Sequence, residues 1–125
     1  MRRLRICEER GSGIDKVVFQ TELFQLPAPK FEVLPENTRT TLFAYMDYKD
    51  MDTADKVRAT YLHCCLQYVS HQPMNNTSLR ERFKVEETYS SSISRVIKQT
   101  VEEGLIRLYD PKANRKSWRY VPFWA

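Results

Sequence analysis

The sequence predicts a fold of the α+β class, and two observations carry this prediction. From residue 52 to residue 103, apolar side chains recur at intervals of three and four residues, which is the spacing of helices with one buried face. After Gly104 the pattern changes to short aromatic and β-branched runs, which are typical of strands. Hydrophobic residues make up 42% of the chain and charged residues 29%, so we expect a folded protein rather than a disordered one.

Residues 1–51 predict a helix, a glycine turn, a second helix and a β-hairpin. Residues 2–10 read as the end of a helix that nothing before it could cap, so we expect this unit to be the end of a larger upstream domain. The glycine turn is formed by residues 11–13, Gly-Ser-Gly. The second helix ends before Pro27, because proline restricts the residue that precedes it. Its inward face is expected to comprise Ile14, Val17, Val18 and Thr21.

A β-hairpin and a packed connector complete this first unit. Residues 31–33 and 40–43 are rich in β-branched and aromatic side chains, and the turn-forming residues 35–37 separate them. Residues 45–52 mix aromatic and acidic side chains without a period and contain neither glycine nor serine. We therefore expect this stretch to pack against the protein rather than to act as a flexible linker.

The second unit, residues 52–125, begins with a long helix that starts at Asp52 or Thr53 and ends before residue 73. A short extended piece is expected at residues 74–75. The inward face of the long helix is expected to comprise Ala54, Val57, Tyr61, Cys65, Leu66 and Val69.

Two further helices and a hairpin follow. Ser78 and Glu81 have the spacing of a capping box, which predicts a short helix that runs to about residue 83. A third helix is expected over residues 88–103, and Gly104 is placed to end it in a left-handed conformation. Its inward face is expected to comprise Tyr89, Ile93, Val96, Ile97 and Val101.

Two strands, residues 105–109 and 118–123, flank a turn-rich basic loop. A long helix, a short helix, a tight turn, a third helix and a hairpin with a basic tip is the order of a winged helix-turn-helix. The sequence therefore predicts a helix-turn-helix-hairpin remnant followed by a winged-helix domain.

The third helix is the expected reading element, because in a helix-turn-helix the second helix enters the major groove of DNA. Its polar face offers hydroxyl groups for phosphate at the positive end of the helix dipole, and Arg95 is the residue there that can make a bidentate contact with guanine. A solvated helix face is the alternative, and the glutamates at both ends of the helix favour it. The predicted DNA-binding residues of this helix are Ser90, Ser91, Ser94, Arg95 and Lys98.

The basic loop is the second predicted DNA-binding element. Residues 1–76 hold ten basic and ten acidic side chains, whereas residues 77–125 hold ten basic and six acidic, so the excess positive charge lies in the second half. We expect Trp118 and Tyr120 to stiffen the strand behind the loop. Basic hairpins also serve solubility or discourage edge pairing, which is the alternative interpretation. The predicted phosphate-binding residues of this element are Lys112, Arg115, Lys116 and Arg119.

Other constellations predict little chemistry. Cys64 and Cys65 are adjacent on a helix and diverge by about 100°, so we expect core packing rather than a metal site or a nucleophile. The glycines of residues 11–13 lack the lysine of a phosphate-binding loop. No apolar run is long enough for a membrane span, and the three cysteines form no disulfide framework. We expect a cytoplasmic, non-enzymatic protein with no cofactor and no metal.

Four stretches carry a family resemblance: residues 8–17 (EERGSGIDKV), 26–33 (LPAPKFEV), 38–43 (TRTTLF) and 120–125 (YVPFWA). Together they resemble bacterial transcriptional regulators that carry a Schlafen/AlbA-like DNA-binding domain at the N-terminus. In that family a region follows that is named as ATP-binding or as the C-terminal part of a RecG-like ATP-dependent DNA helicase. The resemblance covers essentially the whole chain and implies that it is the C-terminal piece of such a regulator.

The sequence thus predicts a DNA-binding module with double-stranded DNA, the missing N-terminal domain of the same protein and a second copy of the chain as partners. One alternative is a protein-interaction or dimerisation module that uses the same fold, with residues 45–51 and Trp124 as its contact surfaces. A second alternative is a fragment of an ATP-dependent helicase-related enzyme, which a deep pocket beside residues 11–13 would favour.

Overall fold

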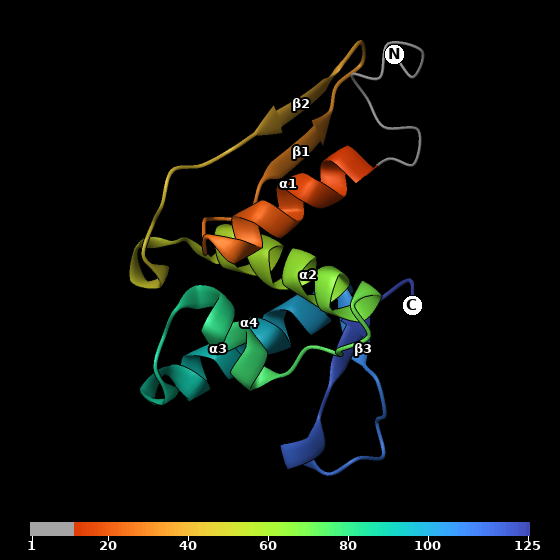
Figure 1. The fold of residues 1–125 in the computed structure, drawn as a ribbon. Coiled ribbons are helices and arrows are strands. Elements are labelled where there is room, and N and C mark those ends of the chain that lie inside the picture. The colour runs from red at the N-terminus through yellow and green to blue at the C-terminus, as the bar shows by residue number, and fades with distance from the viewer. Residues whose placement is uncertain (1–11) are drawn as a thin grey trace.

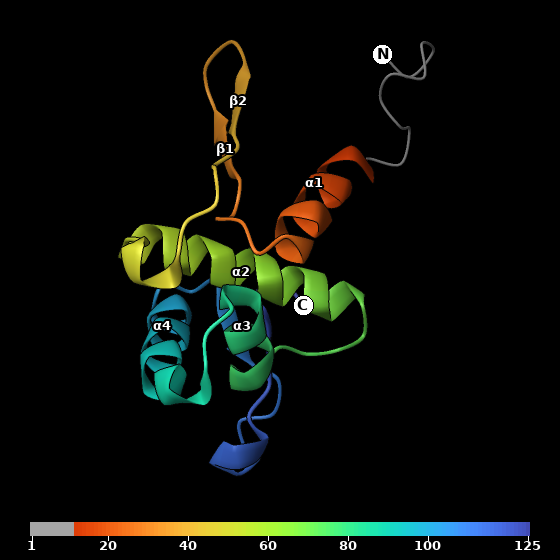
Figure 2. The ribbon, with the colours of Figure 1, turned by 60° about the vertical axis from the view of Figure 1, so that its left-hand side comes forward.

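The computed structural model describes residues 12–125 and has the predicted α+β fold (Figure 1). Its helix α2 (Thr53–Val69) lies at the centre. On one side of α2 lie helix α1 (Ser12–Leu23) and the antiparallel hairpin of β1 (Lys30–Val33) and β2 (Thr38–Thr41). On the other side lie α3 (Asn76–Phe83), α4 (Ser90–Glu102) and the antiparallel hairpin of β3 (Ile106–Leu108) and β4 (Tyr120–Pro122). The two hairpins therefore project from opposite sides of α2 (Figures 1 and 2).

Helix α1 corrects the predicted glycine turn. Ser12 and Gly13 already belong to α1, so these two residues are helical and do not form the predicted turn. Glycine costs only about 0.5–1 kcal/mol in a helix, and the fold tolerates that cost here. The predicted helix over residues 2–10 and Gly11 lie outside the described residues.

The inward face of α1 was predicted in part. Thr21 is buried and Val17 and Val18 are half-buried, but Ile14 is 60% exposed. The reason is that the N-terminal end of α1 extends away from α2 (Figure 2). The helix ends at Leu23, before the predicted stop at Pro27.

The β1–β2 hairpin and the connector after it agree with the prediction. Lys30 lies opposite Thr41 and Val33 opposite Thr38, and the Leu34 N–H donates to the Asn37 carbonyl at 2.7 Å. The connector packs as expected, because Tyr48 and Met51 are buried in the core that α2, α3 and α4 share. A short 3-10 helix, Tyr48–Asp50, forms part of it.

Tyr48 packs at the end of α3 and the start of α4, which are the two helices of the predicted helix-turn-helix. Its ring lies 4.9 Å from the ring of Phe83 at the end of α3, and 6.1 Å from the ring of Tyr89 just before α4. Its hydroxyl lies 2.7 Å from the hydroxyl of Ser92 in α4. A residue of the connector is therefore packed between α3 and α4.

Helix α2 begins as predicted, but the prediction of its buried face was wrong. Asp52 caps it by accepting a hydrogen bond from the Asp55 N–H at 2.8 Å. Of the predicted face only Val57 is buried, whereas Tyr61, Cys65 and Leu66 are half-buried and Ala54 and Val69 are exposed. Because α1 packs on one side of α2 and α4 on the other, the buried residues of α2 do not form a single apolar stripe. The buried residues are Val57, Ala59, Thr60, His63 and Cys64.

Helix α3 begins earlier than predicted, because a different residue caps it. Asn75 accepts a hydrogen bond from the Ser78 N–H at 2.8 Å, and the Ser78 hydroxyl accepts one from the Asn75 N–H at 3.1 Å. The predicted box of Ser78 and Glu81 was therefore wrong. Asn75 has an extended backbone and a short side-chain acceptor, which suits an N-cap better than a residue already inside the helix.

Helix α4 follows a 3-10 turn, Glu87–Tyr89, and Gly104 ends it with a φ of 77°, as predicted. Its core residues are Ile93, Val96, Ile97 and Thr100. Tyr89 and Val101 were expected to face inward, but they are 41% and 37% exposed. Thr100 continues the buried stripe of α4 at helical spacing, in place of Val101. Its hydroxyl donates to the Val96 carbonyl at 2.8 Å, so its burial leaves no unsatisfied polar group.

Strands β3 and β4 are shorter than predicted, and a third extended segment joins them. The Tyr120 N–H donates to the Met74 carbonyl at 2.8 Å, which confirms the extended piece predicted before α3. Met74 and Val121 are fully enclosed by the core. This hairpin and its loop, residues 105–123, are called the wing below.

A buried ion-pair network, the Glu22 network, ties α1 to α2 and α3. The Glu22 carboxylate lies 2.7 Å from Nδ1 of His63 in α2 and accepts a hydrogen bond from Nε of Arg82 in α3 at 2.6 Å. Arg82 also donates to the Leu26 carbonyl at 2.5 Å, and Nε2 of His63 lies 3.2 Å from the Ser78 hydroxyl. The two predicted units thus share buried charges, and their boundary near residue 52 stays a prediction.

Candidate nucleic-acid interface

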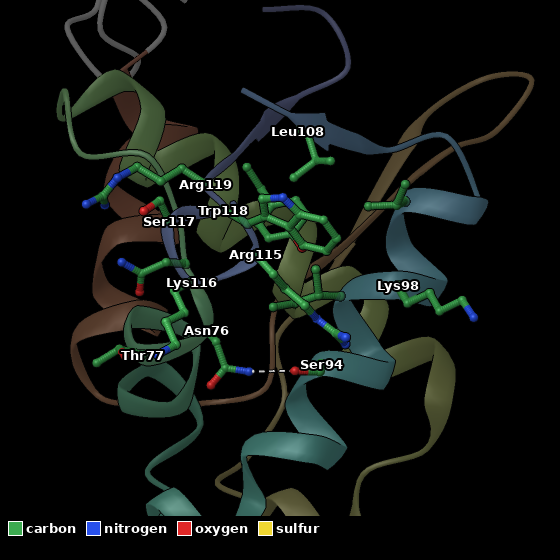
Figure 3. A pocket seen from close by; sticks show the side chains of 14 residues that line it. Asn76, Thr77, Ser94, Lys98, Leu108, Arg115, Lys116, Ser117, Trp118 and Arg119 are labelled. Carbon is green, nitrogen blue, oxygen red and sulfur yellow. Dashed lines mark hydrogen bonds between the residues drawn. The ribbon is translucent and has the colours of Figure 1, made fainter. Parts of the chain in front are cut away.

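A groove of about 600 Å³ runs between α4, the start of α3 and the wing (Figure 3). The start of α3 forms one wall, α4 another, and the loop of the wing closes the third side. The lining residues are Asn75, Asn76, Thr77, Ser94, Ile97, Lys98, Val101, Leu108, Arg115, Lys116, Ser117, Trp118, Arg119 and Tyr120.

The rim of the groove is cationic. Lys98 comes from α4, whereas Arg115, Lys116 and Arg119 come from the wing, and all four side chains are exposed. Arg115 turns towards Ser94 and into the groove, while Lys98 and Arg119 point to opposite sides (Figure 3). None of the residues that line the groove is acidic. The groove therefore favours an anionic ligand.

The floor of the groove is apolar and partly aromatic. Trp118 lies in the middle of it (Figure 3), and its indole N–H donates to the Ala113 carbonyl at 3.1 Å. The guanidinium carbon of Arg115 lies 5.8 Å from the centre of the Trp118 ring. Burial raises the pKa of the Tyr120 phenol above its ordinary value. The apolar residues of the groove are Ile97, Val101, Leu108, Trp118 and Tyr120.

Short polar side chains hold the loop of the wing. Asp110 accepts a hydrogen bond from the Lys112 N–H at 3.0 Å, and Asn114 accepts one from the Ser117 N–H at 3.2 Å. Such local bonds are the reason why aspartate and asparagine favour turns. The second of them caps a 3-10 turn, Arg115–Ser117, which brings the two neighbouring cations to the groove.

Asn76 connects the two helices beside the groove. Its amide NH₂ donates to the Ser90 carbonyl and to the Ser94 hydroxyl, both at 3.0 Å, and Ser90 donates from its hydroxyl to the Asn76 oxygen at 3.3 Å. Arg80 holds the same amide oxygen at 2.9 Å. The Ser90 hydroxyl is thus engaged within the protein, while Ser94 accepts a bond and keeps its own proton to donate.

The structure brings five of the nine predicted DNA-binding residues together. Ser94, Lys98, Arg115, Lys116 and Arg119 line the groove. Ser91, Arg95 and Lys112 are exposed but do not line it, and Ser90 is half-buried against Asn76.

Sequence reasoning missed the wall that α3 contributes and the position of the indole. The capping box was placed on the wrong residue, so residues 75–77 were not considered as part of a site. Trp118 was assigned only to stiffening a strand. A run that mixes cations with an aromatic residue, as residues 115–119 do, is the signal that could have indicated a binding surface.

The residues set aside as packing residues take no part in this groove. Cys64 is fully buried, and burial raises the pKa of its thiol to about 12, while His63 belongs to the Glu22 network. Within residues 12–125, histidine, cysteine and acidic side chains form no cluster of three that could hold a metal ion. None of the helices in this part of the chain is both long enough and apolar enough to cross a bilayer.

Residues 1–42 match a family model described as "Putative ATP-dependent DNA helicase recG C-terminal". Within the described part of the chain the match takes in α1 and the β1–β2 hairpin and ends before α2. None of the curated proteins matches the chain, and none of the solved structures does. The RecG-like part of the predicted resemblance is therefore found in the first unit, whereas the match does not extend to the groove or the wing.

Proposed function

We propose that this chain binds double-stranded DNA through α4 and the wing. The observation that carries the proposal is the cationic rim of the groove, because its charges come from the two elements that a winged helix-turn-helix presents to DNA. Phosphate contacts supply most of the affinity of such modules, and arginine and lysine at a hairpin tip suit that role.

The residues divide into those that position DNA and one that reads it. Arg115, Lys116 and Arg119 on the wing, with Lys98 on α4, are proposed to contact phosphates, and the exposed Lys112 extends this surface. Ser91 is proposed to donate to phosphate near the start of α4, and Ser94 lies on the proposed DNA-binding face of the same helix. Arg95 is exposed on the same helix and is the proposed contact to a guanine edge.

The wider role follows the family likeness of the first unit. We propose that the module belongs to a protein related to the RecG-like family, with DNA as its target and gene regulation as its use. A further DNA-binding domain of the Schlafen/AlbA type and pairing with a second copy of the chain are parts of this proposal.

Fluorescence anisotropy on blunt duplexes at several salt concentrations tests the proposal. The logarithm of affinity should fall with the logarithm of salt by about 0.9 per phosphate neutralised. Replacing Arg115 and Lys116 with alanine removes about two such contacts. When salt rises from about 50 to 200 mM, the variant should therefore lose roughly tenfold less affinity than the unchanged protein loses. Sequence preference should remain, because these cations position the protein rather than read bases.

Two further variants sharpen the test. Replacing Lys30 and Arg39 with alanine removes the same charge from the β1–β2 hairpin, on the opposite side of α2, and should leave the salt slope unchanged. Arg95→Ala should weaken binding to the preferred site by roughly 1–3 kcal/mol and to random DNA by little. Absence of duplex binding at low salt, or equal effects of the two double variants, would favour a protein-interaction module instead.

A second candidate function is that of a fragment of an ATP-dependent helicase-related enzyme. The match of residues 1–42 to the RecG-like family model favours it. In such an enzyme the groove would serve as the site that holds DNA, so both candidates require nucleic-acid binding by α4 and the wing. Binding of ATP by this chain would favour the enzyme over the regulator.

A further inference from the structure

The groove contains more than phosphate contacts require. A phosphate on the surface needs cations and hydrogen-bond donors, which the rim provides. Beneath the rim lies a cavity of about 600 Å³ with an apolar floor, within the roughly 300–1,000 Å³ of small-molecule sites. Polar groups on its walls, such as those of Asn75 and Thr77, surround this floor. The groove therefore fits a ligand that joins a flat apolar ring to an anion.

We propose that the groove holds one unpaired nucleotide of a DNA strand, with its base against Trp118 and its phosphate on Arg115 and Lys116. The proposal rests on nucleic-acid binding by α4 and the wing and names the part of the DNA that this groove takes. The chain should therefore bind DNA with an unpaired segment, such as a single-stranded tail, more tightly than a blunt duplex.

The indole is held in place for such a contact. Its hydrogen bond to the Ala113 carbonyl fixes the ring, so stacking a base on it costs little additional side-chain entropy. In a duplex the faces of each base are covered by its neighbours, so only a base that has left the stack can reach the floor of the groove.

The walls offer hydrogen bonds to the edge of a base. Both N–H groups and the oxygen of the Asn76 amide are engaged by Arg80 and by the two serines of α4, so Asn76 holds Ser94 in place rather than contacting a base itself. Ser94 keeps a proton that it can donate to a base. Arg115 points into the groove close to Ser94, which places a cation next to the space above the indole (Figure 3). A base on the floor thus lies within reach of both a cation and hydrogen-bonding groups.

The experiment uses the intact chain with the substitution Trp124→Phe, which leaves Trp118 as the only tryptophan. Trp124 lies against Tyr68 and Tyr61 and does not line the groove. A blunt duplex, the same duplex with about five unpaired thymidines, and free thymidine monophosphate are titrated. The tailed duplex should quench Trp118 and bind roughly tenfold or more tightly than the blunt duplex, which should cause little quenching.

Matched variants show whether the indole itself makes the difference. Trp118→Ala should lower affinity for the tailed duplex by roughly ten- to a hundredfold, down to that of the blunt one, and Trp118→Phe should keep most of the preference. Tyr109→Ala removes an exposed aromatic of the wing that does not line the groove and should change nothing. If Trp118→Ala lowers the melting temperature, Val101→Tyr, which fills the groove from α4, should abolish the preference in a folded protein.

Each outcome decides the proposal. Equal affinity for tailed and blunt duplexes overturns it but leaves duplex binding standing, whereas no binding to either DNA overturns both proposals. Quenching by thymidine monophosphate without a preference for the tail assigns the groove to a free nucleotide and overturns the strand assignment. A tail preference that survives both Trp118→Ala and Val101→Tyr shows that the unpaired segment binds elsewhere.

Discussion

Replacing Glu22 with glutamine tests whether the Glu22 network holds the first unit on the second. The side chain of Arg82 is 2% exposed and that of Glu22 10%, so the substitution leaves a buried guanidinium without its anion. Removing one partner of a buried ion pair costs about 3–5 kcal/mol. Because Arg82 keeps its bond to the Leu26 carbonyl, we expect the lower end of this range, about 3 kcal/mol.

Urea unfolding measures this loss as a lower midpoint with an unchanged slope. For a chain of this length the melting temperature should fall by about 10 °C. Glu32→Gln is the matched control, since Glu32 pairs with Arg39 and Lys30 on an exposed hairpin and should leave the midpoint where it is. Replacing Glu22 and Arg82 together with leucine should destabilise less than Glu22→Gln, because no unpaired cation remains. A loss below about 1 kcal/mol for Glu22→Gln would refute the assigned burial and pairing.

The remaining predictions concern the core, the start of α3, the thiols and nucleotide binding. Ile97→Ala should lower the free energy of unfolding by roughly 2–5 kcal/mol, and Lys98→Ala by no more than about 0.5 kcal/mol; equal shifts in urea midpoint would contradict the helical phase of α4. Asn75→Ala should cost about 1 kcal/mol, whereas Glu81→Ala should cost little, and a reversal would restore the capping box predicted from sequence. With a pKa of about 12, the Cys64 thiol is almost entirely protonated at pH 8, so iodoacetamide should leave it unmodified until the protein unfolds or the pH approaches that value, as peptide mass spectrometry would report. Calorimetric titration with ATP and magnesium should detect no binding by this chain, and saturable micromolar binding would favour the helicase-related alternative.

Local signals predicted the start of α2 and the end of α4. Asp52 at the start of α2 and Gly104 after α4 act through bonds within a few residues, so their roles are visible in the sequence. The change from helical spacing to short aromatic runs likewise predicted the wing. The start of α3 was missed although its signal is local, because asparagine and serine compete for the same capping role within four residues.

The candidate site depends on long-range packing, and the sequence predicted it only in part. The cations of the wing were found from charge alone, but the groove exists because the start of α3 meets the wing. The Glu22 network joins residues separated in sequence by 41 and 60 positions, and no periodicity relates them. The burial of α2 was misjudged for the same reason, since which of its sides is covered depends on where α1 and α4 dock.

The position of Tyr48 has a consequence for dissecting the protein. The domain boundary predicted from the sequence suggests a truncation at residue 52, which would leave α2, α3, α4 and the wing as a separate fragment. Such a fragment would lack the Tyr48 ring, which packs between the end of α3 and the start of α4, and its hydrogen bond with Ser92. We expect the angle between the two helices to relax in that fragment, so DNA measurements on it would describe a differently shaped surface.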